Sequence, residues 1–154
     1  GIPVFNTPGA NANAVKELVA AAMLLASRDI VGGIAFARAQ DPAMSAQDMN
    51  TLMEQEKKRF AGAELAGKTL GVVGLGSIGS LVAKQGFDFG MEVVGFDPAL
   101  SVEAAWRLPS EVQRMENVQS LFSRSDFISL HLPVLDSTRG LVNEEMLTHF
   151  KKGS

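Results

Sequence analysis

Residues 68–97 of the chain read KTLGVVGLGSIGSLVAKQGFDFGMEVVGFD, and this stretch decides the fold class. Its apolar run Leu70–Val73 predicts a strand that is buried on both faces, as the strands of parallel sheets are. A helical pattern follows from near Ser77 to Gly90, and Glu92–Phe96 predicts a second strand. Strand, helix and strand in this order are typical of a unit of a parallel α/β sheet.

Three glycines separate the first strand from the helix. Gly74, Gly76 and Gly79 have the Gly-x-Gly-x-x-Gly spacing, in which the first permits a tight turn, the second lets a pyrophosphate approach the backbone, and the third lets the helix pack on the strand. The helix start near Ser77 would point unpaired N–H groups and the positive end of the helix dipole at such a phosphate. Glycine turns of this kind also serve packing alone, but the full strand-turn-helix-strand order favours dinucleotide binding.

Asp97 follows the second strand directly, 18 residues after Gly79. A carboxylate at this point accepts hydrogen bonds from the adenosine ribose hydroxyls and repels a 2′-phosphate. Neither Arg nor Lys occurs between Pro98 and Glu103. The sequence therefore predicts NAD, rather than NADP, as the cofactor.

Composition excludes several classes of function. The formal net charge is -3 and the basic residues are scattered, which argues against a nucleic-acid surface. The chain has no cysteine, which excludes disulfides and thiolate metal sites, and we expect no bound metal. We see no apolar run long enough to span a bilayer and no signal peptide. We expect a soluble, cytoplasmic protein that acts on a small-molecule substrate.

The N-terminal third predicts a short strand over Ile2–Phe5 and then a long helix over Ala14–Ala39, about 39 Å at 1.5 Å per residue. Asn11 and Asn13 are both candidate N-caps for this helix. Its apolar residues extend around more than one face, which indicates either a subunit interface or the core of a monomer. The pair Gly32-Gly33 indicates a bend or a close-packing point.

A second, peripheral helix is expected after Asp41-Pro42. The stretch from Ser45 to Asp48 resembles a capping box with Asp in place of Glu. Four apolar residues then recur at helical spacing, namely Met49, Leu52, Met53 and Phe60. We interpret the two methionines as packing residues rather than ligands.

Weaker patterns follow Asp97. Ser101 is a candidate cap for a short helix that contains Trp106. Because the loop after the second strand borders the adenine site, Trp106 is a candidate cofactor contact, although we favour a packing or surface role for it. Residues 111–115 predict a weak third strand, and residues 118–124 predict a short helix.

The fourth predicted strand, Phe127–Leu130, ends at His131-Leu132-Pro133. This tripeptide would lie at the carboxyl end of a parallel strand, where sheets of this kind bind ligands. A last helix is expected after Asn143 as N-cap, with Lys151-Lys152 in its final turn and Gly153 at the C′ position.

Four strands connected in this way predict a Rossmann-type doubly wound α/β sheet of order 3-2-1-4, preceded by the long N-terminal helix. Only the first half of such a sheet is present, so the edge of the fourth strand is left where a fifth would pair. The chain also opens with Gly1 rather than Met. We therefore expect residues 1–154 to be an NAD-binding domain truncated at its C-terminal side.

Five segments carry a more specific signal. They are NTPGAN at 6–11, LAGKTLGVVGLGSIG at 65–79, GFDP at 95–98, DFISLHLP at 126–133 and TRGLVN at 138–143. In this order they resemble the D-isomer-specific 2-hydroxyacid dehydrogenases, and the resemblance covers essentially the whole chain. It implies NAD-dependent oxidation of a D-2-hydroxy acid, with 3-phosphoglycerate the favoured substrate. It also implies that the substrate-binding domain, and the Arg and the Glu-His pair that act on the substrate, lie outside this sequence, so we expect no catalytic residue in it.

The resemblance implies roles for residues of the cofactor half. Ser77 and Ile78 match loop residues whose backbone meets the pyrophosphate, Asp97 matches the ribose ligand, and His131–Pro133 matches a segment that lies along the cofactor. His131 therefore does not match the family's acid/base histidine. Asn11 matches a polar residue near the substrate, although a role as helix cap explains it equally well.

The resemblance also bears on partners. The long N-terminal helix resembles the family's dimer-forming element, which implies a homodimer. An alternative function is an NAD-sensing protein-interaction module of the corepressor type, which uses the same fold without catalysis. A structural remnant that binds nothing is a third interpretation.

Overall fold

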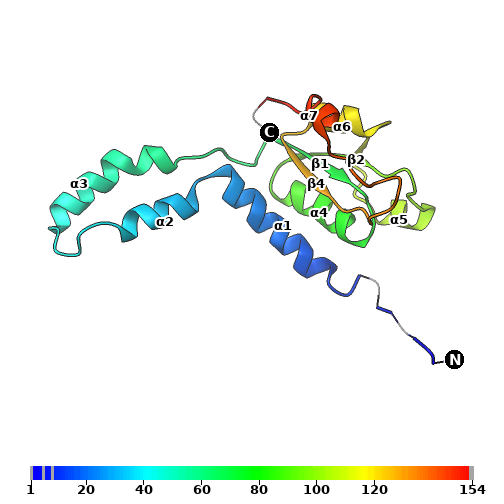
Figure 1. Ribbon diagram of the computed structural model, residues 1–154, viewed down its shortest axis with the longest axis horizontal. Coiled ribbons are helices and arrows are strands. Elements are labelled where there is room, and N and C mark those ends of the chain that lie inside the picture. The colour runs from blue at the N-terminus through cyan, green and yellow to red at the C-terminus, as the bar shows by residue number, and fades with distance from the viewer. Residues whose placement is uncertain (1, 5, 8, 153–154) are drawn as a thin grey trace.

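The sheet is built around β1 (Thr69–Val73), in which every residue is buried. In the computed structural model, which describes residues 2–4, 6–7 and 9–152, β1 pairs in parallel with β2 (Glu92–Phe96) and with β4 (Phe127–Leu130). The short β3 (Gln113–Arg114) pairs in parallel with β2, which gives the order β3-β2-β1-β4. The predicted α/β class, parallel direction and strand order are confirmed (Figure 1).

Helices cover both faces of this sheet. On one face α4 (Ser77–Asp88) connects β1 to β2, and α5 (Val102–Arg107) follows β2. α6 (Val118–Arg124) packs on the other face. The buried core of the first face includes Leu70, Val72, Val82, Ala83 and Val93, and that of the second consists of Val73, Val94, Val118, Leu121 and Phe122. Neighbouring residues of β1 and β2 thus point to opposite faces, which is the two-residue period of a strand.

The predicted single helix over 14–39 is wrong, because the chain forms two helices there. They are α1 (Ala12–Ser27) and α2 (Ile30–Arg38), and their axes differ by 66°. The break lies at Arg28, which is extended, and at Asp29, whose carboxylate accepts a hydrogen bond from the Gly32 N–H and caps α2. The helix therefore ends before the glycine pair that suggested a bend.

Close packing, the alternative interpretation of this pair, is found at Gly32, where a Cβ would lie 2.1 Å from the Asp29 carboxylate, whereas Gly33 makes an ordinary contact. A Cβ on Gly33 would lie 3.6 Å from the Phe60 ring. Phe60 ends the 3₁₀ turn η1 (Lys57–Phe60), which continues α3 (Ala46–Glu56). The Phe60 ring lies 5.3 Å from that of Phe36 on α2, so the two helices pack through these aromatic residues.

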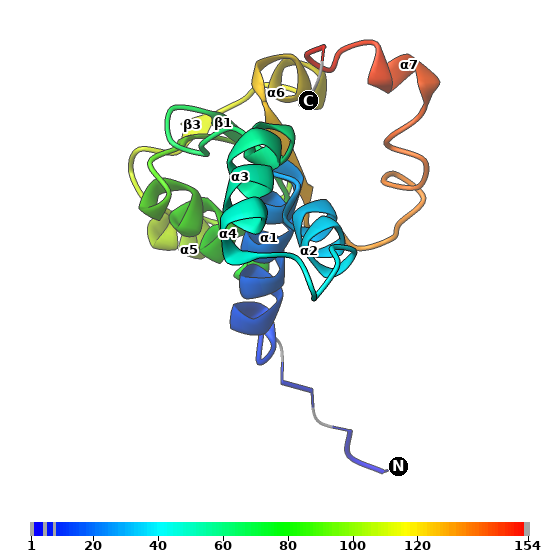
Figure 2. The same ribbon diagram turned by 90° about the vertical axis from the view of Figure 1, so that its left-hand side faces the viewer.

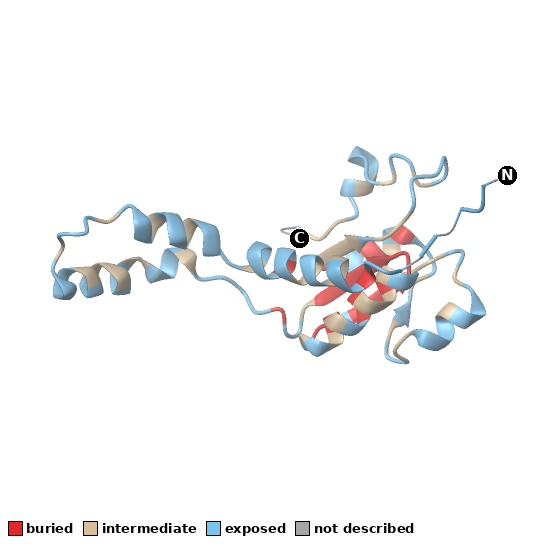
Figure 3. Cartoon of the chain, turned by 90° about the horizontal axis from the view of Figure 1, so that it is seen from below, coloured by how far each residue is buried: buried red, intermediate tan, exposed pale blue. Residues whose placement is uncertain are grey.

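We call α2, α3 and η1 the arm. α1 packs along α4 beside the sheet, whereas the arm extends away from it (Figures 1 and 2). None of the arm's helical residues is buried, and the buried residues gather in the sheet (Figure 3). α3 begins as predicted, because the Ser45 hydroxyl accepts a hydrogen bond from the Asp48 N–H. Met49 and Met53 are half-buried in the arm rather than part of the core.

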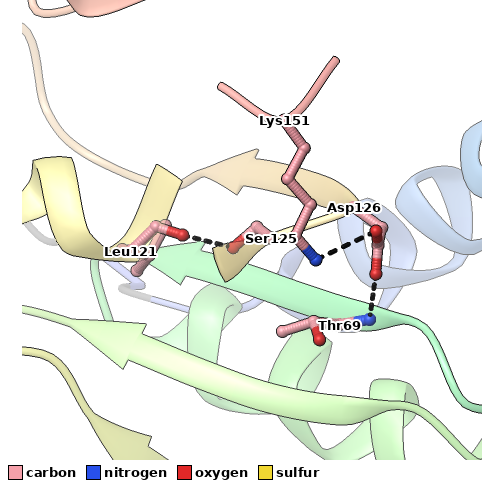
Figure 4. Close-up of polar contacts among 5 residues, drawn as sticks. All are labelled: Thr69, Leu121, Ser125, Asp126 and Lys151. Atoms are coloured by element: carbon pink, nitrogen blue, oxygen red, sulfur yellow. Dashed lines mark hydrogen bonds and ion pairs between the residues drawn. The ribbon is translucent and has the colours of Figure 1, made fainter. Parts of the chain in front are cut away.

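The C-terminal helix is shorter than predicted. α7 (Glu144–Leu147) is capped by Asn143, as expected, but Lys151 lies beyond its end. The Lys151 ammonium instead pairs with the Asp126 carboxylate at 3.0 Å, which in turn accepts a hydrogen bond from the Thr69 backbone N–H (Figure 4). Lys151 is thus held by the amino-terminal end of the sheet and not by a helix dipole. The expected C′ residue, Gly153, lies outside the described residues.

These contacts lower the pKa of the Asp126 carboxylate. Burial by itself would raise the pKa of Asp126, but the hydrogen bond from Thr69 and the charge of Lys151 hold it below its ordinary value. Next to it, the buried Ser125 hydroxyl donates to the Leu121 carbonyl, 2.7 Å away. The start of β4 is therefore tied both to β1 and to α6 (Figure 4).

The N-terminal segment differs from its prediction. Residues 2–4 form no strand, and Phe5, the last residue of the predicted strand, lies outside the described residues. In the part of the chain that the structure describes, no single helix is long and apolar enough to cross a membrane. The bent pair α1 and α2 passes that test only when the two are counted together.

Candidate cofactor site

The glycine loop between β1 and α4 is shaped by two close backbone contacts. Gly74 has a φ of 87°, and a Cβ there would lie 2.4 Å from the His131 carbonyl oxygen. A Cβ on Gly79 would lie 1.8 Å from the carbonyl oxygen of Gly74. Side chains at 74 and 79 would therefore collide with backbone, as the predicted turn and packing roles require.

Gly76 is different, because a Cβ there would meet no atom of the described residues within 4 Å. It is exposed and is the N-cap of α4, and no side chain caps the helix at this end. The N–H groups of the first turn, at Ser77 and Ile78 among others, have no partner within the helix. The loop thus leaves open backbone donors where a pyrophosphate would bind.

Asp97 lies beside this loop. Its Oδ2 accepts a hydrogen bond from the Leu75 N–H at 2.8 Å, and its Oδ1 accepts one from the Ala99 N–H at 2.9 Å. The carboxylate is therefore fixed between the glycine loop and the end of β2. Each oxygen has a second lone pair, which can accept a hydrogen bond from a ribose hydroxyl.

His131, Leu132 and Pro133 follow the carboxyl end of β4, which pairs with β1 on the side opposite to β2. The His131 N–H donates to the Val73 carbonyl at 2.8 Å, which continues the strand pairing past β4. Leu132 packs toward the α6 face, with its Cδ2 at 3.0 Å from a Cβ built on Gly74, while Pro133 is exposed. The tripeptide thus lies at the carboxyl end of a parallel strand, as predicted, and His131 and Leu132 border the glycine loop at Gly74.

The His131 side chain is not arranged for acid–base work. Its Nε2 lies 2.8 Å from the Ser129 hydroxyl, and burial lowers its pKa, so the imidazole is neutral at pH 7. No ion pair joins either histidine to a carboxylate anywhere in the described residues, and His149 is exposed. A paired carboxylate is what a histidine base needs to hold its orientation and its charge.

A cleft of about 720 Å³ lies at the end of β2, next to Asp97. Trp106 lines it with 85% of its surface exposed, so this residue has the surface position that we favoured and shares the cleft with Asp97, the predicted ribose ligand. Among the lining residues that sequence reasoning did not propose are Leu75 and Arg114. Leu75 was detectable as a variable position of the glycine motif, but Arg114 reaches the cleft only because β3 pairs with β2.

Asn11 is exposed and occupies the N-cap position of α1, but its side chain makes no capping hydrogen bond. Asn11 is thus the N-cap by position, as one of the two predicted candidates, but without a side-chain capping bond, while the other candidate, Asn13, lies inside α1. The neighbouring Gly9 lies against the start of α4, since a Cβ on it would be 3.3 Å from the Ser77 Cβ. Gly9 thus lies beside the start of α4, where the pyrophosphate is predicted to bind, while a substrate role for Asn11 stays a prediction.

Open backbone donors at a helix N-terminus, with an acid at the end of the next strand, define a Rossmann-type dinucleotide-binding domain. Residues 20–154 match the family described as "D-isomer specific 2-hydroxyacid dehydrogenase, NAD binding domain", and the chain belongs to this family. NAD(H) is accordingly the cofactor of this domain, and the residues around Gly76 and Asp97 fit it.

Known proteins of the family are similar over the whole chain. A hydroxypyruvate reductase of Thermotoga maritima is 41% identical over 99% of this chain and 44% of its own length. A D-3-phosphoglycerate dehydrogenase of Methanocaldococcus jannaschii is 37% identical over 100% of this chain and 26% of its own. Among solved structures, the D-mandelate dehydrogenase of Rhodotorula graminis superimposes with a TM-score of 0.76 at 28% identity, over 96% of this chain and 41% of that one. The chain thus spans less than half the length of these relatives.

Proposed function

We propose that this chain is the cofactor-binding part of an NAD-dependent oxidoreductase that acts on a D-2-hydroxy acid. The observation that carries the proposal is the open helix N-terminus at Gly76, with the Asp97 carboxylate fixed beside it by the Leu75 N–H. The backbone donors would bind the pyrophosphate and the carboxylate would bind the adenosine ribose. Together they would orient the cofactor along the carboxyl edge of the sheet.

This chain's residues would hold the cofactor rather than perform the proton transfer. When bound, the nicotinamide ring of NAD(H) carries the hydride that such a reaction transfers. His131–Pro133 would lie along the cofactor and exclude water from its buried side. Because neither histidine has a carboxylate partner among the described residues, we propose that the acid–base group comes from a part of the protein outside this sequence.

The substrate that we propose is 3-phosphoglycerate, oxidised to 3-phosphohydroxypyruvate in serine biosynthesis. It is supported by relatives named D-3-phosphoglycerate dehydrogenase at 37% to 40% identity. The Thermotoga relative is named hydroxypyruvate reductase, which makes hydroxypyruvate the second candidate. Both are small acids whose reacting hydroxyl or carbonyl group is on the carbon next to the carboxylate. The cofactor half therefore has no feature that distinguishes them, because we propose that the groups that act on the substrate lie outside this sequence.

Cofactor titration tests the first part of this proposal. NADH binding is followed by calorimetry and by the fluorescence of Trp106, the chain's single tryptophan. We expect NADH to bind and NADPH to bind at least about 10-fold more weakly, because the Asp97 carboxylate repels a 2′-phosphate. Equal binding of both would contradict the role of Asp97.

Substrate is tested on the full-length protein, with 3-phosphoglycerate and NAD⁺ in one direction and hydroxypyruvate and NADH in the other. A higher kcat/KM for 3-phosphoglycerate would support the proposal, whereas a higher kcat/KM for hydroxypyruvate would make hydroxypyruvate the substrate. Cofactor binding with no turnover of any 2-hydroxy acid would favour the alternative, an NAD-sensing interaction module. That alternative is supported here by the exposed apolar arm.

We also propose that the protein is a homodimer through α1 and the arm. Large apolar side chains are exposed on these helices, with Leu18 at 70%, Val31 at 66% and Ile34 at 49%. Exposed apolar area of this kind marks interaction surfaces. We expect Val31→Asp and Ile34→Asp to reduce the mass measured by light scattering from dimer to monomer. Leu147→Asp, at an exposed leucine of α7, is the matched control; an unchanged mass in the arm variants would contradict the interface.

A further inference from the structure

The adenosine end of the cleft carries two opposite charges that are distant in sequence. Arg114 pairs with Gly95 in the β2–β3 register, and Asp97 lies two residues after Gly95, directly beyond the end of β2 at Phe96. If the chain continues extended for one residue past β2, the two-residue period puts Asp97 on the same face as Gly95 and its partner Arg114, and an extended strand would put the Cα atoms of Asp97 and Arg114 about 8 Å apart. Both side chains line the cleft of about 720 Å³.

The two charges are held differently. Both oxygens of Asp97 accept backbone N–H groups, so this carboxylate is fixed. Arg114, in contrast, forms no ion pair or hydrogen bond with the side chains that the structure describes, and it is exposed. Among the described residues that line the cleft, it is also the one with a positive charge. Its guanidinium is available to an anion bound beside Asp97.

We propose that Arg114 is a second determinant of nucleotide selectivity. It supplies a cationic partner for a phosphate on the 2′ position of the adenosine ribose, since a guanidinium binds phosphate through two parallel hydrogen bonds. The Asp97 carboxylate opposes this by like-charge repulsion. The site therefore excludes 2′-phosphorylated nucleotides through Asp97 alone, and removing that charge exposes an existing phosphate partner.

The inference rests on the proposed function only in taking this cleft as the adenosine site. It is tested with two probes that differ by one group, 5′-AMP and adenosine 2′,5′-bisphosphate, so that the nicotinamide end plays no part. Dissociation constants are measured by calorimetry on the wild-type protein, D97N, and D97N combined with R114Q. NADH and NADPH are titrated in parallel.

We expect the wild-type protein to bind 5′-AMP more tightly than the bisphosphate. D97N keeps the shape of the side chain and one acceptor, and should tighten bisphosphate binding by about 10-fold or more, the scale of a charge-assisted hydrogen bond. Adding R114Q should remove most of that gain. Raising the salt to about 0.5 M should weaken the gain as well, because exposed charges are screened.

The matched control is R107Q in the D97N background, which removes the same charge from α5, where Arg107 pairs with Glu103 instead of lining the cleft. The gain should survive in this control. D97S serves as a second variant if D97N is unstable by circular dichroism. Absence of a gain in both Asp97 variants, or equal losses from R114Q and R107Q, would overturn the inference. A wild-type protein that binds neither NADH nor 5′-AMP would instead overturn the cofactor site itself.

Discussion

The sheet unit and the arm differ in how far they bury their apolar side chains. In the sheet unit, β1 is buried along its whole length and its side chains pack against helices on both faces. The arm has no buried helical residue, and it is held together mainly by Phe36, Phe60 and the Arg59 guanidinium, which lies 5.6 Å from the centre of each ring. The sheet unit therefore buries its apolar side chains within the chain, whereas the arm leaves apolar side chains exposed, which is the basis of the dimer interface that we propose.

The most severe test of the self-sufficient sheet unit is Gly79→Ala. Its Cβ would lie 1.8 Å from the Gly74 carbonyl oxygen, so helix α4 must move away from the loop. We expect a loss of more than about 3 kcal/mol in the free energy of unfolding, measured by urea denaturation. A variant as stable as the wild type would show that the loop tolerates a side chain and that this packing is wrong.

Gly76→Ala separates binding from packing in the same loop. An alanine fits the backbone, whose φ is -69°, and meets no atom of the described residues within 4 Å, but its methyl group would enter the open space beside the start of α4, where we propose that the pyrophosphate binds. We expect NADH to bind about 10-fold more weakly or worse, while the free energy of unfolding changes by less than about 0.5 kcal/mol. Calorimetry and denaturation on one preparation measure both. Unchanged NADH affinity would place the pyrophosphate elsewhere.

The arm is tested with Phe60→Ala, which removes the ring that packs on Phe36 and on Gly33. We expect a local loss of about 1–2 kcal/mol, since the site is only half-buried. Hydrogen exchange should become faster in α2 and α3 and stay unchanged in β1. Leu147→Ala, outside the arm, is the control; faster exchange in β1 would mean that the two regions unfold together.

The smallest expected effect concerns Asp126, at the amino-terminal end of the sheet. Because its pKa in the folded protein is below its ordinary value of 3.8, its ionised form stabilises the fold above that value, and this contribution is lost as the pH falls toward the folded pKa. Asp126→Asn should therefore lower the free energy of unfolding at pH 7 by up to about 1 kcal/mol. Denaturation between pH 3 and pH 7 should show the difference from wild type shrinking in acid; a constant difference would exclude ionisation as its cause.

How much could be predicted differs between the same two regions. The bounds of α6, β2 and β4 and the start of α4 agree with the sequence pattern, because short connections and local periodicity determine them. The break at Arg28 and Asp29 was missed, because the apolar pattern continues across it. The hydrogen bond from the Gly32 N–H to the Asp29 carboxylate, which caps a new helix there, is not visible in that pattern. In the arm, the local sequence was compatible with either a bend or a close-packing point at Gly32-Gly33, and only the side-chain contacts of the folded chain distinguish the two.

The site shows the same division. The glycines, Asp97 and His131–Pro133 were predicted because motif spacing and strand ends specify them. Arg114 was not, since the sequence predicts only a weak strand over residues 111–115, and its pairing with β2, which forms over Gln113–Arg114, is what brings this side chain to the cleft.

The sequence by itself determined the order of strands and helices and the chemistry of the glycine loop, because these depend on periodicity and on backbone freedom within a few residues. Only the tertiary structure decided which distant residues share the cleft and where the arm leaves the sheet. The register between strands and the place where a helix breaks depend on contacts that form only in the folded chain, and the local sequence pattern does not specify those contacts.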